Sequence, residues 1–187
     1  MRFFTALLLV IALVACTPGG ERDVERSEVG PTATAGAVSI TYPPAADALQ
    51  LTADQLIARW SQTLEEELGA PPAVLSDGRI EAGAGNAPIS LEAVVTADAV
   101  SVVQLALIDG SGDDDELRSS AAIMAFLGLI LPEGSNASDV DAAFGELGFG
   151  ENGTLFGLAE NEYTVGGLTV YRASNEDTIL LGAVASP

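Results

Sequence analysis

The chain has 187 residues, a net charge of −20 at pH 7 and no histidine, and all seven of its basic residues are arginine. Without histidine or lysine the chain has no Ser-His-Asp or Cys-His catalytic group, no imidazole metal site, no Schiff-base lysine and no phosphate-binding loop lysine. A surface this acidic also repels phosphate backbones, so we expect no nucleic-acid partner.

An apolar segment stands at the beginning of the chain. Arg2 precedes a run over residues 3–15 in which Thr5 is the only polar residue, and Pro18 follows shortly afterwards. The run is too short for a bilayer-spanning helix, which needs about 20 apolar residues. A positive start, a short apolar centre and small residues at the exit are typical of a secretory signal. An ordinary signal peptide cut near Ala15 is one interpretation.

The only cysteine, Cys16, completes the motif Leu13-Val14-Ala15-Cys16. This motif resembles the lipobox of bacterial lipoproteins at all four positions. The resemblance implies cleavage before Cys16, a diacylglycerol on its thiol and a lipid bilayer as the partner of the acylated residue. Two or more acyl chains attach a protein firmly to a membrane, whereas one chain binds only marginally. It also implies an extracytoplasmic position in the bacterial envelope. Because Thr17 and not an aspartate follows, sorting to the inner leaflet of the outer membrane is favoured in a two-membrane organism.

The remaining chain divides into two parts. Residues 16–36 are rich in Pro, Gly, Thr, Ala and charge without an apolar period, which predicts a lipidated amino terminus and a flexible tether. Residues 37–187 are long enough for a single acidic domain. Once Cys16 is acylated no cysteine is left for a disulfide, so this domain depends on apolar burial.

Strand patterns alternate with helix patterns along the domain. Alternating or β-branched runs predict strands at 38–42, 89–96, 100–108, 154–158, 163–165, 168–171 and 178–184. Residues 97–99 and 174–177 are expected to be the turns of two hairpins. The fold class is therefore α+β, with an antiparallel sheet of about four to five strands and about three helices packed on one face.

The first predicted helix follows a capping box, in which Thr52 is the N-cap and Gln55 reaches back to it. Its apolar stripe contains Leu56, Ile57, Trp60, Leu64 and Leu68, and Gly69 ends it. We interpret Trp60, the only tryptophan, as a core anchor. Two further helices are expected at 113–131, apolar nearly all round in its second half and therefore buried, and at 138–147 before Gly148.

One acidic loop invites a test for calcium. Asp109 to Glu116 offers side-chain oxygens at alternate positions, as the EF-hand loop does. Asp114 stands where the sharp-turn glycine belongs, and Ser120 stands where the bidentate glutamate belongs, so the EF-hand pattern fails. A solvated helix start and an irregular calcium site remain as interpretations. From the sequence we name no metal-binding, cofactor-binding or catalytic residue. Cys16 is the one site residue that we predict, as the site of lipidation.

Two functional hypotheses remain. The first is a membrane-anchored envelope lipoprotein whose domain binds or scaffolds another envelope protein without catalysis. The second is an envelope hydrolase that uses only Asp and Glu, because hydrolysis of glycosides needs two carboxylates at a set separation. A carboxylate pair facing one deep pocket would favour the hydrolase, and an exposed apolar patch or an open sheet edge would favour the binding domain.

Overall fold

The computed structural model describes residues 32–43, 48–63, 72–75, 77–83, 88–96, 99–109, 113–150 and 155–186, without the side chains of residues 113–115. In these ranges the chain forms three helices and nine strands, an α+β fold as predicted. The strands are β1 (Thr32–Ala35), β2 (Val38–Thr41), β3 (Ala73–Val74), β4 (Arg79–Ala82), β5 (Ile89–Thr96), β6 (Ala99–Ile108), β7 (Ala159–Val165), β8 (Leu168–Ser174) and β9 (Thr178–Ala185). The helices are α1 (Ala53–Thr63), α3 (Asp113–Ile130) and α4 (Ala137–Glu146).

Seven strands make one antiparallel sheet in the order β3-β4-β5-β6-β9-β8-β7, and β1 and β2 make a separate two-stranded sheet. The two hairpins predicted from the sequence, β5–β6 and β8–β9, are confirmed, and β6 pairs with β9 to join them. The expected four to five strands are too few. The strands β3 and β4 have two and four residues, too short for a periodic signal; β4 pairs with the edge of β5, and β3 pairs with β4.

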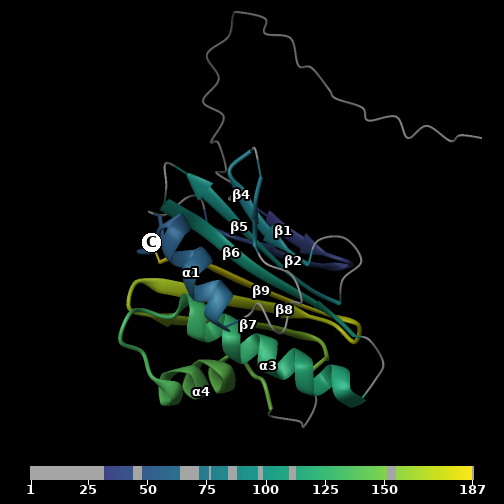
Figure 1. Ribbon diagram of the computed structural model, residues 1–187. Coiled ribbons are helices and arrows are strands. Elements are labelled where there is room, and N and C mark those ends of the chain that lie inside the picture. The colour runs from purple at the N-terminus through teal and green to yellow at the C-terminus, as the bar shows by residue number, and fades with distance from the viewer. Residues whose placement is uncertain are drawn as a thin grey trace, which may run out of the picture.

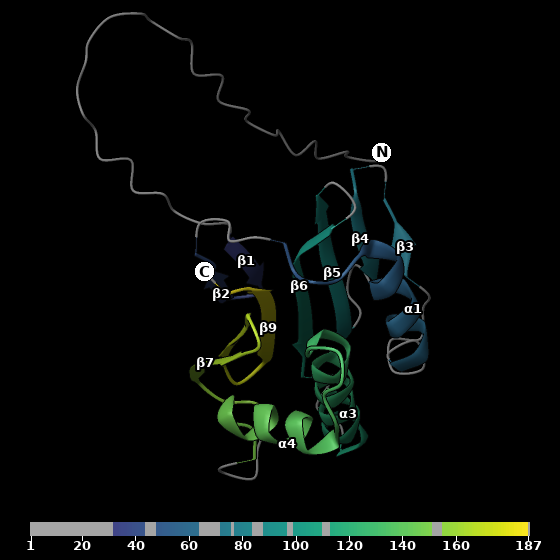
Figure 2. The same ribbon diagram turned by 90° about the vertical axis from the view of Figure 1, so that its left-hand side faces the viewer.

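The fold has three layers (Figures 1 and 2). The helices lie on one face of the seven-stranded sheet, as predicted, and the β1–β2 hairpin lies on the opposite face. Because side chains alternate along a strand, β5, β6, β8 and β9 place apolar side chains on both faces of the sheet. In β9, Leu181 and Ala183 face the helices while Leu180 and Val184 face the hairpin.

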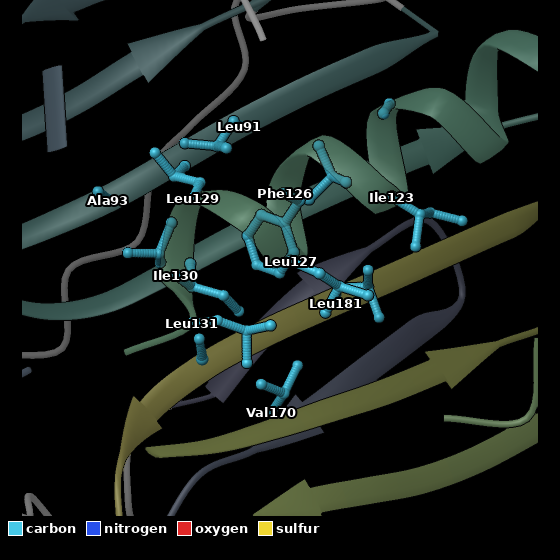
Figure 3. Close-up of a cluster of buried hydrophobic side chains, with 14 of the residues drawn as sticks. Leu91, Ala93, Ile123, Phe126, Leu127, Leu129, Ile130, Leu131, Val170 and Leu181 are labelled. Atoms are coloured by element: carbon cyan, nitrogen blue, oxygen red, sulfur yellow. The ribbon is translucent and has the colours of Figure 1, made fainter. Parts of the chain in front are cut away.

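The main core lies between the helices and the sheet (Figure 3). The second half of α3 packs Ile123, Phe126 and Leu127 onto Leu91 of β5 and Leu181 of β9, and all five side chains are buried. The helix α3 contacts both α1 and α4, which explains why apolar residues surround its second half. In the part of the chain that the structure describes, no helix is both long and apolar enough to cross a membrane.

Helix α1 begins as its capping box predicts. The backbone N–H of Gln55 donates to Thr52 Oγ1 at 3.2 Å, and the backbone N–H of Thr52 donates to Gln55 Oε1 at 2.9 Å. Trp60 is fully buried, so the interpretation as a core anchor is confirmed. The described helix ends at Thr63; Leu64, Leu68 and Gly69 lie outside the described residues.

Helix α4 begins one residue earlier than predicted, because Asn136 is its N-cap. The side chain of Asn136 accepts from Ser138 N at 2.8 Å, and Asp139 Oδ2 accepts from Asn136 N at 2.7 Å. The chain leaves the helix through Gly148, whose φ of 75° favours glycine. This end agrees with the prediction.

Two boundaries differ from the sequence-based expectation. The predicted tether, residues 16–36, overlaps the domain: Thr32–Ala35 is strand β1, which pairs with β2 across the turn at Gly36. Its small side chains give no strand signal, and packing of Ala33 on the sheet supplies the missing stability. The strand expected at residues 154–158 is also wrong. Residues 155–158 form a loop, and β7 begins at Ala159.

Candidate functional site

The β1–β2 hairpin covers only part of the outer face of the sheet. Gly36 has φ 59° at the first position of a two-residue turn, which matches the twist of the flanking strands. Below the turn, Ala33, Val38 and Ile40 are buried against residues of β6, β8 and β9. The outer surfaces of β5 and β6 extend beyond β1, and a groove results.

This groove follows β1 along its unpaired edge. It consists of two adjoining hollows of about 400 Å³ and 240 Å³, which share Thr34, Glu92 and Gln104. Val94 and Val102 form an apolar floor in the larger hollow, and Thr32 of β1 lies on its wall. We call this feature the β1 groove and define it by Thr32, Thr34, Glu92, Val94, Val102 and Gln104. A cleft of this size is in the range that binds ligands.

The edge of β1 that faces the groove is open. In the described residues β1 pairs with β2 alone. Antiparallel pairs alternate between those that exchange backbone hydrogen bonds and those whose backbone groups point away from the partner. The pair beside a two-residue turn, here Ala35 and Val38, is of the first kind, so Thr34 and Thr32 direct their N–H and C=O groups away from β2. These groups are the ones available at the groove.

An ion cluster lies beside the groove on β4 and β5. Glu81 and Glu92 are directly opposite each other in the sheet, an unfavourable arrangement of like charges. Arg79 Nη1 separates them, at 2.8 Å from Glu81 Oε1 and 3.1 Å from Glu92 Oε1, while Arg79 Nε lies 2.8 Å from Asp77 Oδ2. These hydrogen bonds, led by the bond to Asp77, raise the pKa of Arg79, and the same bond lowers the pKa of Asp77. One guanidinium therefore faces three carboxylates.

Tyr42 forms the inner wall of the groove. Its ring lies edge-on to that of Tyr171 at 5.9 Å between centroids, and only 2% of the residue is exposed. Burial raises the pKa of its hydroxyl, with smaller contributions from Tyr171 and Glu92. In the described residues this buried hydroxyl has no hydrogen-bond partner. A phenol that stays protonated at neutral pH is a neutral wall and not an acid–base group.

A second, more polar hollow of about 450 Å³ lies on the other side of the hairpin. It is bounded by Ser39 and Thr41 of β2 and by Glu160 and Glu162 of β7. Asn161, Tyr171 and Arg172 complete its described polar lining. The two edges of one hairpin thus face two different hollows.

The residues singled out in the sequence do not meet at either hollow. Cys16 lies outside the described residues, as do residues 110–112 of the acidic loop. In the described ranges no group of three or more Asp, Glu or Cys side chains is placed to hold a metal ion. At the end of the acidic loop, Glu116 Oε1 accepts from Leu155 N at 3.4 Å, a contact within the fold.

Sequence reasoning did not identify the groove. Its residues come from positions 32–34, 92–94 and 102–104, and each segment carries the ordinary pattern of a strand. A faint signal was available in β5, where Ser90, Glu92 and Val94 alternate with buried residues and so mark a face that is only half covered. Nothing in that pattern points to β1.

Comparison with protein-family models, with curated proteins and with solved structures gives no match to this chain.

Proposed function

We propose that this protein is a lipid-anchored component of the bacterial envelope whose domain binds a ligand in the β1 groove without catalysing a reaction. The lipobox-like motif ending at Cys16 supports the anchor. The acidic composition supports lipid attachment over electrostatic attachment, because a net charge of −20 is repelled by anionic headgroups. A lipid anchor, a tether and a groove are the parts expected of a binding module that is held near a membrane.

The observation that carries the binding function is the open edge of β1 above an apolar floor. Unpaired backbone groups at a strand edge pair readily with another chain, and natural sheets usually cover or charge them. Here the edge borders a cavity of about 400 Å³. Among the residues that the structure describes, the groove presents a single carboxylate, Glu92, and that group is bound to Arg79, which supports binding over two-carboxylate hydrolysis.

The anchor is tested by replacing Cys16. In the Cys16→Ser variant we expect no incorporation of labelled fatty acid and accumulation of the uncleaved precursor. Because the uncleaved precursor keeps the apolar run over residues 3–15, the readouts are the fatty-acid label and the cleavage, not release from membranes. Incorporation of labelled fatty acid into the variant would contradict the lipoprotein assignment.

The groove is tested by photo-crosslinking in intact cells. A photoreactive phenylalanine analogue replaces Gln104 on the groove floor, and the matched control carries it at Ala142, an exposed position of α4 on the other side of the sheet. We expect a discrete adduct from position 104 and none from position 142. Equal adducts from both positions, or none from either, would contradict the assignment of the groove as the binding site.

A further inference from the structure

We infer that the ligand of the β1 groove is an extended, cationic peptide segment of a partner protein, which adds to β1 as a third strand. This inference rests on the proposed function and names the chemistry of its ligand. Strand addition of this kind obtains affinity from main-chain hydrogen bonds and specificity from alternate side chains. The β1 groove offers both.

The backbone of β1 provides the hydrogen-bonding groups for an added strand. Thr32 and Thr34 direct two N–H and two C=O groups into the groove, and β1 has four residues, a length of about 13 Å. Both hollows lie along this edge, from Thr32 in one to Gly36 in the other. The space is therefore elongated in the direction of a strand, which suits a peptide better than a compact ligand.

The floor of the groove provides the side chains that an added strand would contact. Along β5 and β6 the side chains that face the added strand are Val94 and Val102 at one end and Glu92 and Gln104 in the middle. Alternate side chains of an extended peptide point to this floor. An apolar β-branched side chain matches the pair of valines, and a basic side chain at the next position that faces the floor matches Glu92. Beyond it, Ala106 and Ile108 of the second hollow match a further apolar side chain.

The acidic residues beside the groove favour a positively charged ligand. Asp77, Glu81 and Glu92 surround the single guanidinium of Arg79, so the cluster is negative by two charges. Glu92 has a side chain that is 38% exposed and can accept a second cation on its open side. Because the whole chain carries −20, the same sign prevails at longer range and attracts basic segments.

The test uses a fluorescent heptapeptide with blocked termini and the lipidated full chain in non-ionic detergent. The probe has threonine at its four odd positions and valine, lysine and valine at its three even positions, so that the valines and the lysine can share one face of a strand. We expect saturable binding that weakens as ionic strength rises. Replacing the lysine of the probe by glutamate should reduce affinity at least tenfold.

Backbone pairing is tested on both partners. Alternate residues of the probe are N-methylated in two versions, one at the odd positions and one at the even positions. Successive N–H groups of a strand point to opposite edges, so one version should lose binding and the other should keep it. In the protein, Thr34→Pro removes an N–H at the groove edge. Its matched control is Ser39→Pro, which removes the N–H of the cross-strand partner at the opposite edge of the hairpin.

We expect Thr34→Pro to weaken binding at least tenfold and Ser39→Pro to leave it within twofold of the unmodified protein. The inference is overturned if the glutamate probe binds equally well, if neither N-methylated version loses binding, or if the two proline variants behave alike. The methylated probes decide the matter even if a proline variant fails to fold. An adduct at position 104 without peptide binding would support the proposed function but contradict the inference that its ligand is a peptide. A dimer that dissociates in Thr34→Pro, again without peptide binding, would assign the groove to a second copy of the chain.

Discussion

The ring of Tyr42 lies directly on the α-carbon of Gly182, in the middle of strand β9. A methyl group at residue 182 would stand 2.7 Å from Tyr42 Cε1 and Cζ and closer still to the hydroxyl oxygen. Gly182 therefore provides the space in which the wall of the β1 groove sits against the sheet. The hairpin approaches this closely because one strand position has no side chain.

Gly182→Ala is expected to lower the free energy of unfolding by about 2 kcal/mol, because the ring and the hairpin must move to admit the methyl group. Chemical denaturation measures this change. Combining Gly182→Ala with Tyr42→Leu should show a coupling of about 1 kcal/mol or more, since the smaller side chain removes the clash. Strict additivity of the two changes would contradict the contact.

A matched glycine tests the same substitution where space is free. Gly128 lies in α3 and an added methyl group would meet nothing within 4 Å. Gly128→Ala should raise the free energy of unfolding by about 0.5–1 kcal/mol, because alanine loses less backbone freedom in a helix. The two alanine variants should therefore change stability in opposite directions.

Tyr42→Phe tests the buried hydroxyl through pH. In the unfolded chain Tyr42 loses its proton above its ordinary pKa of 10.0, whereas burial keeps it protonated in the folded state. Above pH 10 the unfolded state thus binds fewer protons than the folded state, so the free energy of unfolding falls as the pH rises toward the folded-state pKa. Below pH 10 the hydroxyl is protonated in both states, and its titration does not lower stability. Denaturation between pH 9 and 11 should show a shallower decline in Tyr42→Phe than in the unmodified protein.

The same variant has an expected effect at neutral pH. Because the hydroxyl has no hydrogen-bond partner in the described residues, removing it should leave stability at pH 7 unchanged or raise it by about 1 kcal/mol. A loss of 1 kcal/mol or more at pH 7 would mean that the hydroxyl does have a partner.

Local signals in the sequence predicted the elements that are stable for local reasons. The capping box at Thr52 and Gln55 and the stripe through Leu56 and Trp60 predicted α1, and both are confirmed. Long alternating or β-branched runs likewise predicted β5, β6 and β9. In α1 and β5 one buried face accounts for the period of the apolar residues, whereas β9 is buried on both faces and is marked by a continuous apolar run.

The elements that were missed depend on partners far away in the chain. Strand β1 has the composition of a linker and becomes a strand only through β2 and the sheet beneath it. The loop before β7 was mistaken for a strand because Leu155 and Phe156 look strand-like. Its carbonyl groups instead accept hydrogen bonds from side chains of β8. The β1 groove combines both difficulties, because it exists only where the hairpin covers part of the sheet.

Arg172 is the side chain that holds this loop. It is 5% exposed and donates to Leu147 O and Leu155 O, each at 2.9 Å, with its guanidinium 3.9 Å above the ring of Phe149. Burial lowers the pKa of this group. The fork geometry of arginine lets one side chain reach both the carbonyl of Leu147 at the end of α4 and that of Leu155 in the loop before β7.

Arg172→Lys should therefore lower the free energy of unfolding by about 2 kcal/mol or more, although the charge is kept, because an ammonium group cannot bind both carbonyls and stack on the ring. Hydrogen exchange should accelerate at residues 147–150 and 155–157. Arg59→Lys is the control, since Arg59 makes a single part-buried bond to Leu129 O at 3.2 Å and should cost about 1 kcal/mol or less. Equal effects of the two substitutions would contradict the bridging role.

Arg79 and Glu92 should tune the β1 groove in opposite directions. Arg79→Gln removes the one cation of the cluster, so affinity for the lysine-containing probe should rise about threefold at low ionic strength, as expected for one solvent-screened charge interaction. Glu92→Gln should lower it by a similar factor. Because both side chains are about 40% exposed, both differences should shrink in high salt. Fluorescence anisotropy at two salt concentrations measures them, and a change of the same sign in both variants would show that charge does not select the ligand.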